Sequence, residues 1–131
     1  MVGGKVRAGE HVVHAAIREV LEETGAKEVR NYVYRGIVSE RLVDSGGNLL
    51  RHFLIFVGCA DIDSFSPHSR EGELALFTDD EVVAKREDFL PSDWWMFQTM
   101  REAGDHCGLY EAELVHTDGT YSLAYYREYE P

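Results

Sequence analysis

The fold is decided by GGKVRAGEHVVHAAIREVLEETGA, the stretch of residues 3–26 near the start of the chain. From Glu10 to Thr24 apolar residues recur at the spacing of an amphipathic helix, and Gly25 follows as a C-terminal stop. The repeating apolar positions are Val13, Ala16, Ile17, Val20 and Leu21. The pattern predicts a helix from Glu10 to Thr24 whose apolar arc packs against the rest of the fold.

Three glutamates share another side of this helix. Glu19, Glu22 and Glu23 stand at i, i+3 and i+4, so their carboxylates project together, away from the apolar arc. Like charges at this spacing destabilise an isolated helix, whereas a bound divalent cation relieves the repulsion. A solvated acidic helix face is the alternative interpretation of these three residues on their own.

The spacing around the glutamates is more specific than the cluster itself. Five residues separate Gly4 from Glu10, seven separate Glu10 from Arg18, and Arg18 is followed by Glu19, Val20, Leu21, Glu22, Glu23, Thr24 and Gly25. From Gly4 to Ala26 this pattern resembles the Nudix box. Its last apolar position departs from the family, because Ala26 is small, and this predicts looser packing after the helix.

The resemblance implies a role for each matched residue. The metal ligands would be the backbone of Gly4 and the carboxylates of Glu19, Glu22 and Glu23. Arg18 would steady these glutamates with its fixed fork of donors, and would complete the catalytic set with them. Glu10 would suit the helix dipole. The structural alternatives are a flexible N-terminus for Gly4, a surface ion pair for Arg18 and a helix cap for Glu10.

The resemblance also implies a reaction and a cofactor. Nudix hydrolases use carboxylate-bound Mg²⁺, which Mn²⁺ can replace, to direct water onto phosphorus and cleave a diphosphate bond. We expect the substrate to be a nucleoside diphosphate linked to another moiety. An isomerase and a coenzyme A diphosphatase are alternatives within the family. A nucleotide sensor that binds a metal without turnover is the alternative outside enzymes, and the three intact glutamates favour the enzyme.

Candidates outside the box are weaker. A general base would come from the box or from a later loop, and Glu71 and Glu73 lie where some family members carry one. For each of them individually, a surface acid is the favoured explanation. Four aromatic residues would stack a nucleobase or lie in the core: Trp94, Trp95, Tyr32 and Tyr34. His52 receives no role, because a lone strand histidine is most often a packing or surface residue.

The middle of the chain is predicted to form strands first. Val29–Val43 and Leu49–Ile62 are rich in β-branched and aromatic residues and flank turn residues 44–47, which predicts a long hairpin. Ser64–Gly72 is predicted to be a loop, and Glu73–Phe77 a short strand.

Two helices and a hairpin are predicted to follow. Thr78 would cap a short helix, and Pro91 would begin another that stops near Gly104. Tyr110–Val115 and Thr120–Tyr129 predict a terminal hairpin. We expect the α/β class, as a Nudix-type α/β/α sandwich around a mixed sheet, in a single domain over residues 1–131.

The box lies close to the start of the chain, whereas family members usually carry two or three strands before it. Residues 114–127 have the order of such a start: an apolar strand, an Asp-Gly turn, a second apolar strand and Arg127. We therefore expect a circularly permuted arrangement, in which this hairpin replaces the strands and Arg127 binds substrate phosphates. Strands exchanged in a homodimer and a truncated reading frame are the alternatives.

Composition restricts the partners and the location. The 131 residues include 24 Asp and Glu against 13 Lys and Arg, and the net charge of −11 argues against a nucleic-acid partner. No apolar stretch approaches the roughly 18 residues of a membrane span. The first residues lack the apolar centre of a secretion signal, and there are 2 cysteines. We expect a cytoplasmic protein that binds a small phosphorylated molecule.

Overall fold

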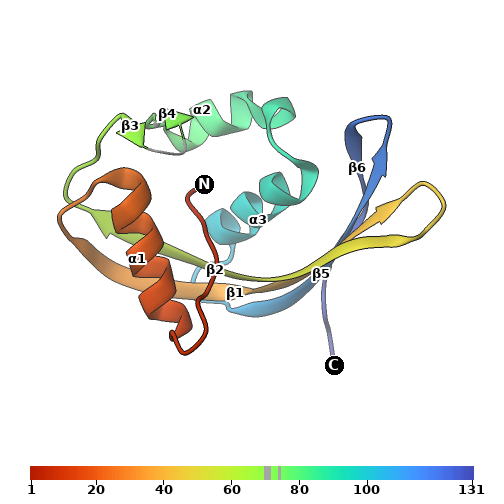
Figure 1. Ribbon diagram of the computed structural model, residues 1–131, viewed down its shortest axis with the longest axis horizontal. Coiled ribbons are helices and arrows are strands. Elements are labelled where there is room, and N and C mark those ends of the chain that lie inside the picture. The colour runs from red at the N-terminus through yellow and green to blue at the C-terminus, as the bar shows by residue number, and fades with distance from the viewer. Residues whose placement is uncertain (70–71, 74) are drawn as a thin grey trace. The chain divides into compact units, whose positions relative to one another are not determined.

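The computed structural model describes residues 1–69, 72–73 and 75–131, with residues 69, 72 and 73 described by their backbone alone. The elements follow the order α1 (Val12–Thr24), β1 (Val29–Asp44), β2 (Leu49–Ile62), β3 (His68–Ser69), β4 (Gly72–Glu73), α2 (Asp79–Ala84), the 3-10 helix η1 (Arg86–Asp88), α3 (Pro91–Glu102), β5 (Gly108–Thr117) and β6 (Thr120–Glu128) (Figure 1). The main sheet is mixed, with strand order β2-β1-β5-β6, and β3 pairs with β4. The predicted α/β class is confirmed.

The chain divides into two compact units. The first comprises Met1–Val33 and Gly58–Thr78, and the second comprises Tyr34–Val57 and Asp79–Pro131. The long strands β1 and β2 each contribute residues to both units. The single domain expected over residues 1–131 stays a prediction. Within the described residues, no helix is long and apolar enough to cross a membrane.

In the first unit, α1 begins at Val12, two residues later than predicted. Glu10 therefore lies before the helix, because its side chain is engaged by Arg18 instead of the helix N-terminus. At the other end, Gly25 takes the predicted stop with a left-handed backbone (φ 69°), and its N–H donates to the Leu21 carbonyl. Glycine adopts this conformation without steric cost, so it ends the helix here.

The C-terminal end of α1 is fastened by its own threonine. Thr24 is buried, its hydroxyl donates to the Val20 carbonyl at 2.6 Å, and the same oxygen accepts the Ala26 N–H at 3.1 Å. The Ser66 N–H donates to the Thr24 carbonyl at 2.5 Å. Ala26 is itself buried, so a small residue occupies an enclosed position there, and the looser packing predicted after the helix stays a prediction.

The packed side of α1 also differs from the predicted arc. Val13 is 43% exposed, whereas Ala15 is only 4% exposed. The side chain of Glu19, four residues after Ala15 and on the same side of the helix, is only 16% exposed. We call residues 3–10 the box loop. Because this loop approaches Glu19, the buried side of α1 includes an acidic residue.

The short strands of the first unit differ from expectation. β3 and β4 pair antiparallel, with His68 opposite Glu73 and Ser69 opposite Gly72. His68 and Ser69 lie within the predicted loop. Of the strand predicted over Glu73–Phe77, Glu73 lies in β4, residue 74 lies outside the described residues, and the prediction is wrong for residues 75–77, which have no regular secondary structure.

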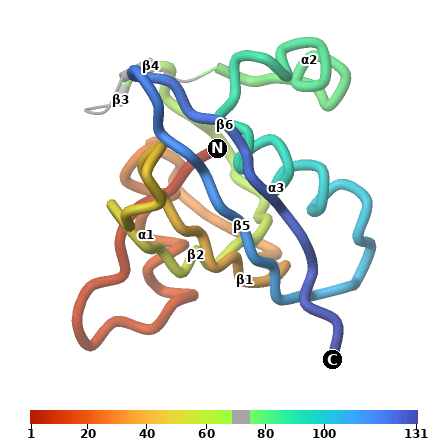
Figure 2. Tube along the Cα trace, turned by 90° about the vertical axis from the view of Figure 1, so that its right-hand side faces the viewer, coloured from red at the N-terminus to blue at the C-terminus, as the bar shows by residue number. Residues whose placement is uncertain are grey.

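In the second unit, the C-terminal hairpin joins the main sheet. β5 pairs in parallel with β1, from Gly36 opposite Gly108 to Asp44 opposite His116, and β6 pairs antiparallel with β5. Figure 2 shows β5 and β6 running alongside each other. Asp118 and Gly119 have positive φ angles of 50° and 78°, which is the backbone of the predicted Asp-Gly turn. The circular permutation itself stays a prediction.

The core of the second unit lies between α3 and the sheet. Val38, Tyr110 and Ala112 alternate inward on β1 and β5 and form a cluster with Met96 of α3. Of the four aromatic residues considered for base stacking, Trp94 is buried, Trp95 and Tyr34 are 40% and 41% exposed, and Tyr32 is half-buried. The Trp95 ring stacks on Tyr126 at 6.0 Å between centroids. The core alternative is therefore right for Trp94.

Candidate active site

Arg18 links the box loop to α1 through Glu10. Its Nε donates to Glu10 Oε2 at 2.8 Å, and its Nη2 donates to Glu10 Oε1 at 2.9 Å. Nη2 also donates to the Lys5 carbonyl at 3.0 Å. These bonds hold Lys5 and Glu10 of the N-terminal segment against the helix, and they give Glu10 a role other than the predicted one at the helix dipole.

The same guanidinium contacts two of the three helix glutamates. Arg18 Nη1 donates to Glu19 Oε1 at 2.6 Å and to Glu22 Oε2 at 3.3 Å. The side chain of Arg18 is only 18% exposed, so these contacts are partly shielded from water. The hydrogen bonds that Arg18 donates to Glu10 and Glu19 raise the pKa of Arg18 further above its usual range, which keeps its charge fixed. The predicted steadying contact between Arg18 and the glutamates is thus present.

Glu10 is held in its charged form. The hydrogen bond from Arg18, with a smaller contribution from the Arg7 N–H, lowers the pKa of the Glu10 carboxyl to about 2. The Arg7 N–H lies 3.1 Å from Glu10 Oε1. Glu10 therefore remains an anion through the whole physiological range and can anchor Arg18 there.

The glycine pair of the box loop lies against the glutamates. A Cβ atom built on Gly4 would stand 2.0 Å from Glu19 Cδ, which is a steric clash. Glycine has no Cβ atom and avoids this clash. The Gly3 N–H donates to Glu23 Oε2 at 3.4 Å. The loop backbone thus reaches the carboxylates closely, as the resemblance implies for Gly4.

The donors present suit a hard divalent cation. Glu19, Glu22 and Glu23 place three carboxylates on little more than one helical turn, and the backbone of Gly4 touches one of them. Carboxylate and carbonyl oxygens are the ligands that Mg²⁺ and Mn²⁺ prefer. Within the part of the chain that the structure describes, no group of three or more acidic, histidine or cysteine side chains is arranged so that it could hold a metal ion. Contacts with Arg18 balance part of the negative charge of Glu19 and Glu22.

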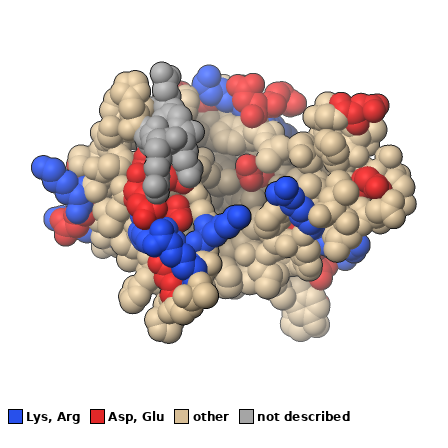
Figure 3. All heavy atoms as spheres, viewed as in Figure 1, with Lys and Arg blue, Asp and Glu red and all other residues tan. Residues whose placement is uncertain are grey.

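Positive charge accompanies the acids on the outside of this region. Figure 3 shows acidic and basic side chains lying side by side over α1. One of these pairs joins Arg7 Nη2 to Glu22 Oε1 at 3.7 Å. Arg7 was not predicted as a site residue, because the box pattern leaves its position open and its contact with Glu22 spans fifteen residues of chain.

Three other residues were predicted for the site from outside the box. Glu71 lies outside the described residues, and Glu73 is described by its backbone in β4 alone. Arg127 is in the second unit, where its Nε donates to Glu111 at 2.9 Å and its guanidinium lies over the Tyr125 ring. The phosphate-binding role of Arg127 and the general base role of Glu71 or Glu73 stay predictions.

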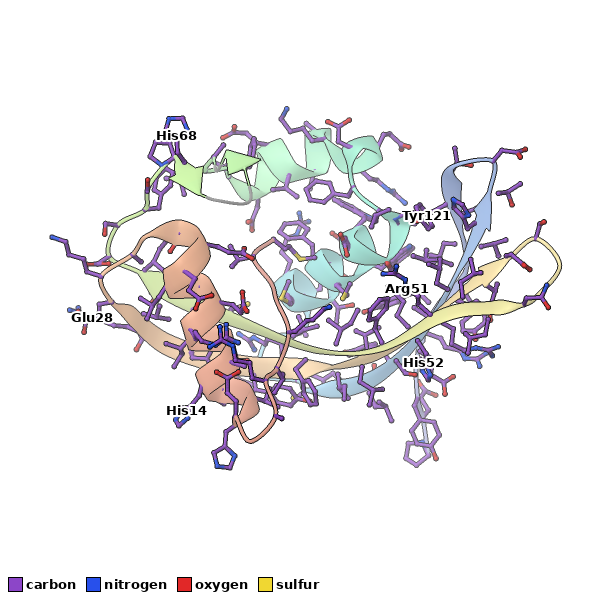
Figure 4. The ribbon with its side chains drawn as sticks, in the orientation of Figure 1. His14, Glu28, Arg51, His52, His68 and Tyr121 are labelled. Atoms are coloured by element: carbon purple, nitrogen blue, oxygen red, sulfur yellow. The ribbon has the colours of Figure 1, made fainter. Side chains whose placement is uncertain are left out.

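The histidines labelled in Figure 4 include two that the sequence analysis leaves without a role. His52 lies on β2, where its Nε2 is 2.9 Å from the Ser39 hydroxyl on β1. This contact between neighbouring strands agrees with a structural role for His52. His14 projects outward from α1 and is exposed.

Sequence reasoning missed a buried acid in the second unit. Glu40 on β1 is only 9% exposed, and among the described residues its Oε2 atom has no hydrogen-bond partner. Burial raises the pKa of Glu40, and the nearby charge of Asp93 adds to the shift. The signal was available, because Glu40 continues the inward alternation of Gly36 and Val38 along the strand.

Both the sequence and the structure are similar to those of known proteins. The family model described as the NUDIX domain matches residues 1–100. The structure is similar to the crystal structure of the mutator MutT protein from Bacillus halodurans, with a TM-score of 0.77 and 28% sequence identity, over 99% of this chain and 82% of that chain. No curated protein sequence matches closely enough to count as a relative.

Proposed function

The chain belongs to the Nudix family of pyrophosphohydrolases, and we propose that it uses a divalent cation held by α1 to cleave the diphosphate bond of a nucleotide derivative. Members of this family generally use divalent metal ions and act on small molecules. What we propose for this chain is that the cation is Mg²⁺, that the substrate is a nucleotide derivative, and that the residues named below hold the cation. The cytoplasmic location and the homodimer stay predictions.

One observation carries the proposal: the box loop and the acidic side of α1 are in contact. Gly4 lies against the Glu19 carboxylate, and Arg18 joins Glu10 of the loop to Glu19 and Glu22 of the helix. In a helix whose acidic side is only solvated, the carboxylates would contact water and not a backbone loop. The contact supports a site built to keep its carboxylates in place, which is what a metal-dependent reaction requires.

The ligands that we propose are the carboxylates of Glu19, Glu22 and Glu23, together with the backbone of Gly4. When bound there, Mg²⁺ or Mn²⁺ would neutralise charge on the diphosphate and lower the pKa of water. Arg18 orients Glu19 and Glu22 through hydrogen bonds, and Glu10 in turn fixes Arg18. Neither Arg18 nor Glu10 needs to contact the substrate for this role.

The reaction that we propose is a hydrolysis. A water oxygen forms a bond to one phosphorus, the bond from that phosphorus to the bridging oxygen breaks, and the bridging oxygen leaves with the other phosphate. A base has to accept the proton of the water, and Glu71 and Glu73 remain our candidates. No covalent bond to the protein is required, so the glutamates act by holding and orienting.

The test is a substrate panel. Purified protein is incubated with nucleoside triphosphates, nucleotide sugars, ADP-ribose and dinucleoside polyphosphates, with Mg²⁺ or Mn²⁺, and the products are separated and identified. We expect one class to yield a nucleoside monophosphate, and reaction in ¹⁸O-water to label one of the two products. Tight binding of a nucleotide without any product would contradict hydrolysis and favour the sensor. Isomerised product would favour the isomerase alternative.

A further inference from the structure

Two arginines contact Glu22, and they are held very differently. Arg18 lies 3.3 Å from Glu22 Oε2, is only 18% exposed, and is bound at the same time to Glu10 and Glu19. Arg7 lies 3.7 Å from Glu22 Oε1, and its side chain is 65% exposed. Arg18 is therefore a fixed partner of Glu22, whereas Arg7 holds it through an exposed pair longer than a hydrogen bond.

The backbone of Arg7 is anchored although its side chain is not. The Arg7 N–H donates to Glu10 Oε1 at 3.1 Å, and the Glu10 N–H donates to the Arg7 carbonyl at 3.0 Å. Glu10 is fixed in turn by Arg18. The Cα atom of Arg7 thus has a set position beside the acidic side of α1, and only the guanidinium is able to change its partner.

A divalent cation at Glu22 would compete with Arg7. Both need the negative charge of the same carboxylate, and a double positive charge repels a guanidinium at close range. The Arg7–Glu22 pair is the weaker of the two arginine contacts, so it is the one to break. The freed guanidinium remains within reach of the site, because its Cα atom does not move. Its planar fork of donors matches a phosphate better than any other side chain does.

We propose that Arg7 is a phosphate-binding residue whose guanidinium neutralises Glu22 in the metal-free protein and transfers to the diphosphate of the substrate once a cation occupies the site. This inference rests on the proposed function, since it requires a cation at Glu22. Arg7 then has two opposite effects: it weakens metal binding on its own, and it strengthens binding of a diphosphate to the metal-loaded protein.

The first measurement follows metal binding without substrate. Mn²⁺ is titrated into wild type, Arg7→Ala and Arg30→Ala, and free Mn²⁺ is followed by electron paramagnetic resonance. Arg30 is the matched control, because it is 66% exposed and pairs with Glu28 on the same unit of the protein. We expect Arg7→Ala to bind Mn²⁺ roughly two- to five-fold more tightly than wild type, since the loss of an exposed ion pair has an effect of this size. Arg30→Ala should match wild type.

The second measurement follows a diphosphate that cannot be hydrolysed. Methylenediphosphonate is titrated into the same proteins at saturating Mn²⁺ by calorimetry. We expect Arg7→Ala to bind it at least about tenfold more weakly, because a charge-assisted hydrogen bond to phosphate is lost. Arg7→Lys should fall between the two, since it keeps the charge without the fork. A purely structural role would weaken both binding events together.

The outcomes separate this inference from the proposed function. Opposite shifts for the two ligands support both. If wild type binds Mn²⁺, and Arg7→Ala has the same affinity as wild type for both Mn²⁺ and methylenediphosphonate, Arg7 does not have the proposed role. The proposed function stands in that case. If wild type does not bind Mn²⁺, both are overturned. In a Glu22→Gln background the Arg7→Ala substitution should leave Mn²⁺ affinity unchanged, and a persistent effect would overturn the competition at Glu22.

Discussion

Arg18 and Glu10, eight residues apart, are joined by two nearly equal hydrogen bonds of 2.8 and 2.9 Å, although only Arg18 lies in a helix. The two bonds form a fork that fixes the orientation of the guanidinium as well as its position. The remaining donor Nη1 is thereby aimed at Glu19 and Glu22. Glu10 thus positions two helix carboxylates that it does not itself contact.

Arg18→Lys should lower turnover at least about tenfold, because a lysine ammonium cannot bond Glu10 through a fork and reach both glutamates. The measurement is kcat together with Mn²⁺ affinity on the substrate found in the panel. Arg30→Lys serves as the control for an arginine replaced elsewhere on the same unit. Equal kcat values for Arg18→Lys and wild type would show that the glutamates need no positioning by the guanidinium.

Glu22→Gln and Glu23→Gln should each reduce turnover at least about 100-fold, because each removes a charged ligand that we assign to the cation. Folding should survive, since neither residue is buried in the core. Turnover is measured at saturating Mg²⁺, with circular dichroism as the check on folding. Chelation of the metal should abolish wild-type activity, and added Mg²⁺ should restore it. Near wild-type turnover in either variant is incompatible with the metal assignment.

Gly4→Ala should displace the Glu19 carboxylate, because the added Cβ would stand 2.0 Å from its Cδ atom. We expect turnover to fall by about tenfold or more, since displaced positioning groups cost rate steeply. The thermal unfolding temperature should change little, because Gly4 is exposed. Gly3→Ala is the control, as a Cβ on Gly3 meets none of the described atoms within 4 Å. Equal losses of turnover in the two variants would argue against a specific contact with Glu19.

The sequence predicted the fold best where the signals are local. β2 runs from Leu49 to Ile62 as predicted, because turn residues precede it and its β-branched and aromatic run is continuous. The end of α1 was predicted by Gly25 for the same reason. The parallel pairing of β5 with β1 could not be predicted, since it depends on contacts between residues that are far apart in the chain.

Contacts between the box loop, Arg18 and the helix glutamates were predicted and are present, while the metal-binding and catalytic roles of these residues stay predictions. The box spacing identified Gly4, Arg18 and the three glutamates, and the structure brings the loop, the arginine and the helix together. The start of α1 was placed too early because the Glu10 side chain bonds to Arg18, a contact that a helical pattern does not reveal. The pair between Arg7 and Glu22 was missed for a similar reason, as it depends on how the loop folds back.

Acid should weaken the fold through Glu10 in a defined window. Its pKa is lowered in the folded state from 4.5 to about 2, chiefly by the hydrogen bond from Arg18. A lowered pKa stabilises the fold fully above the unfolded value, and this contribution is lost as the pH falls from 4.5 toward 2. Urea unfolding of wild type and Glu10→Gln measures it. Wild type should be the more stable at pH 6, and the difference should shrink in this window; a constant difference would contradict the linkage.

Glu40 should act in the opposite direction, because burial raises its pKa in the folded state. An acid with a raised pKa binds more protons in the folded state than in the unfolded state. The charge of Glu40 therefore destabilises the fold once the pH exceeds the pKa of the unfolded state.

Glu40→Gln keeps the shape of the side chain and removes its charge. We expect it to stabilise the protein by about 1 kcal/mol at pH 7, which corresponds to roughly 3 °C in the unfolding temperature. The gain should vanish near pH 4, where Glu40 is protonated in wild type. Glu111→Gln on the neighbouring strand is the control, because Glu111 is only half-buried and is paired with Arg127, so the loss of its charge should bring no gain. A lower unfolding temperature for Glu40→Gln at pH 7, or a gain that persists at pH 4, would show that the buried carboxylate is satisfied in its charged form.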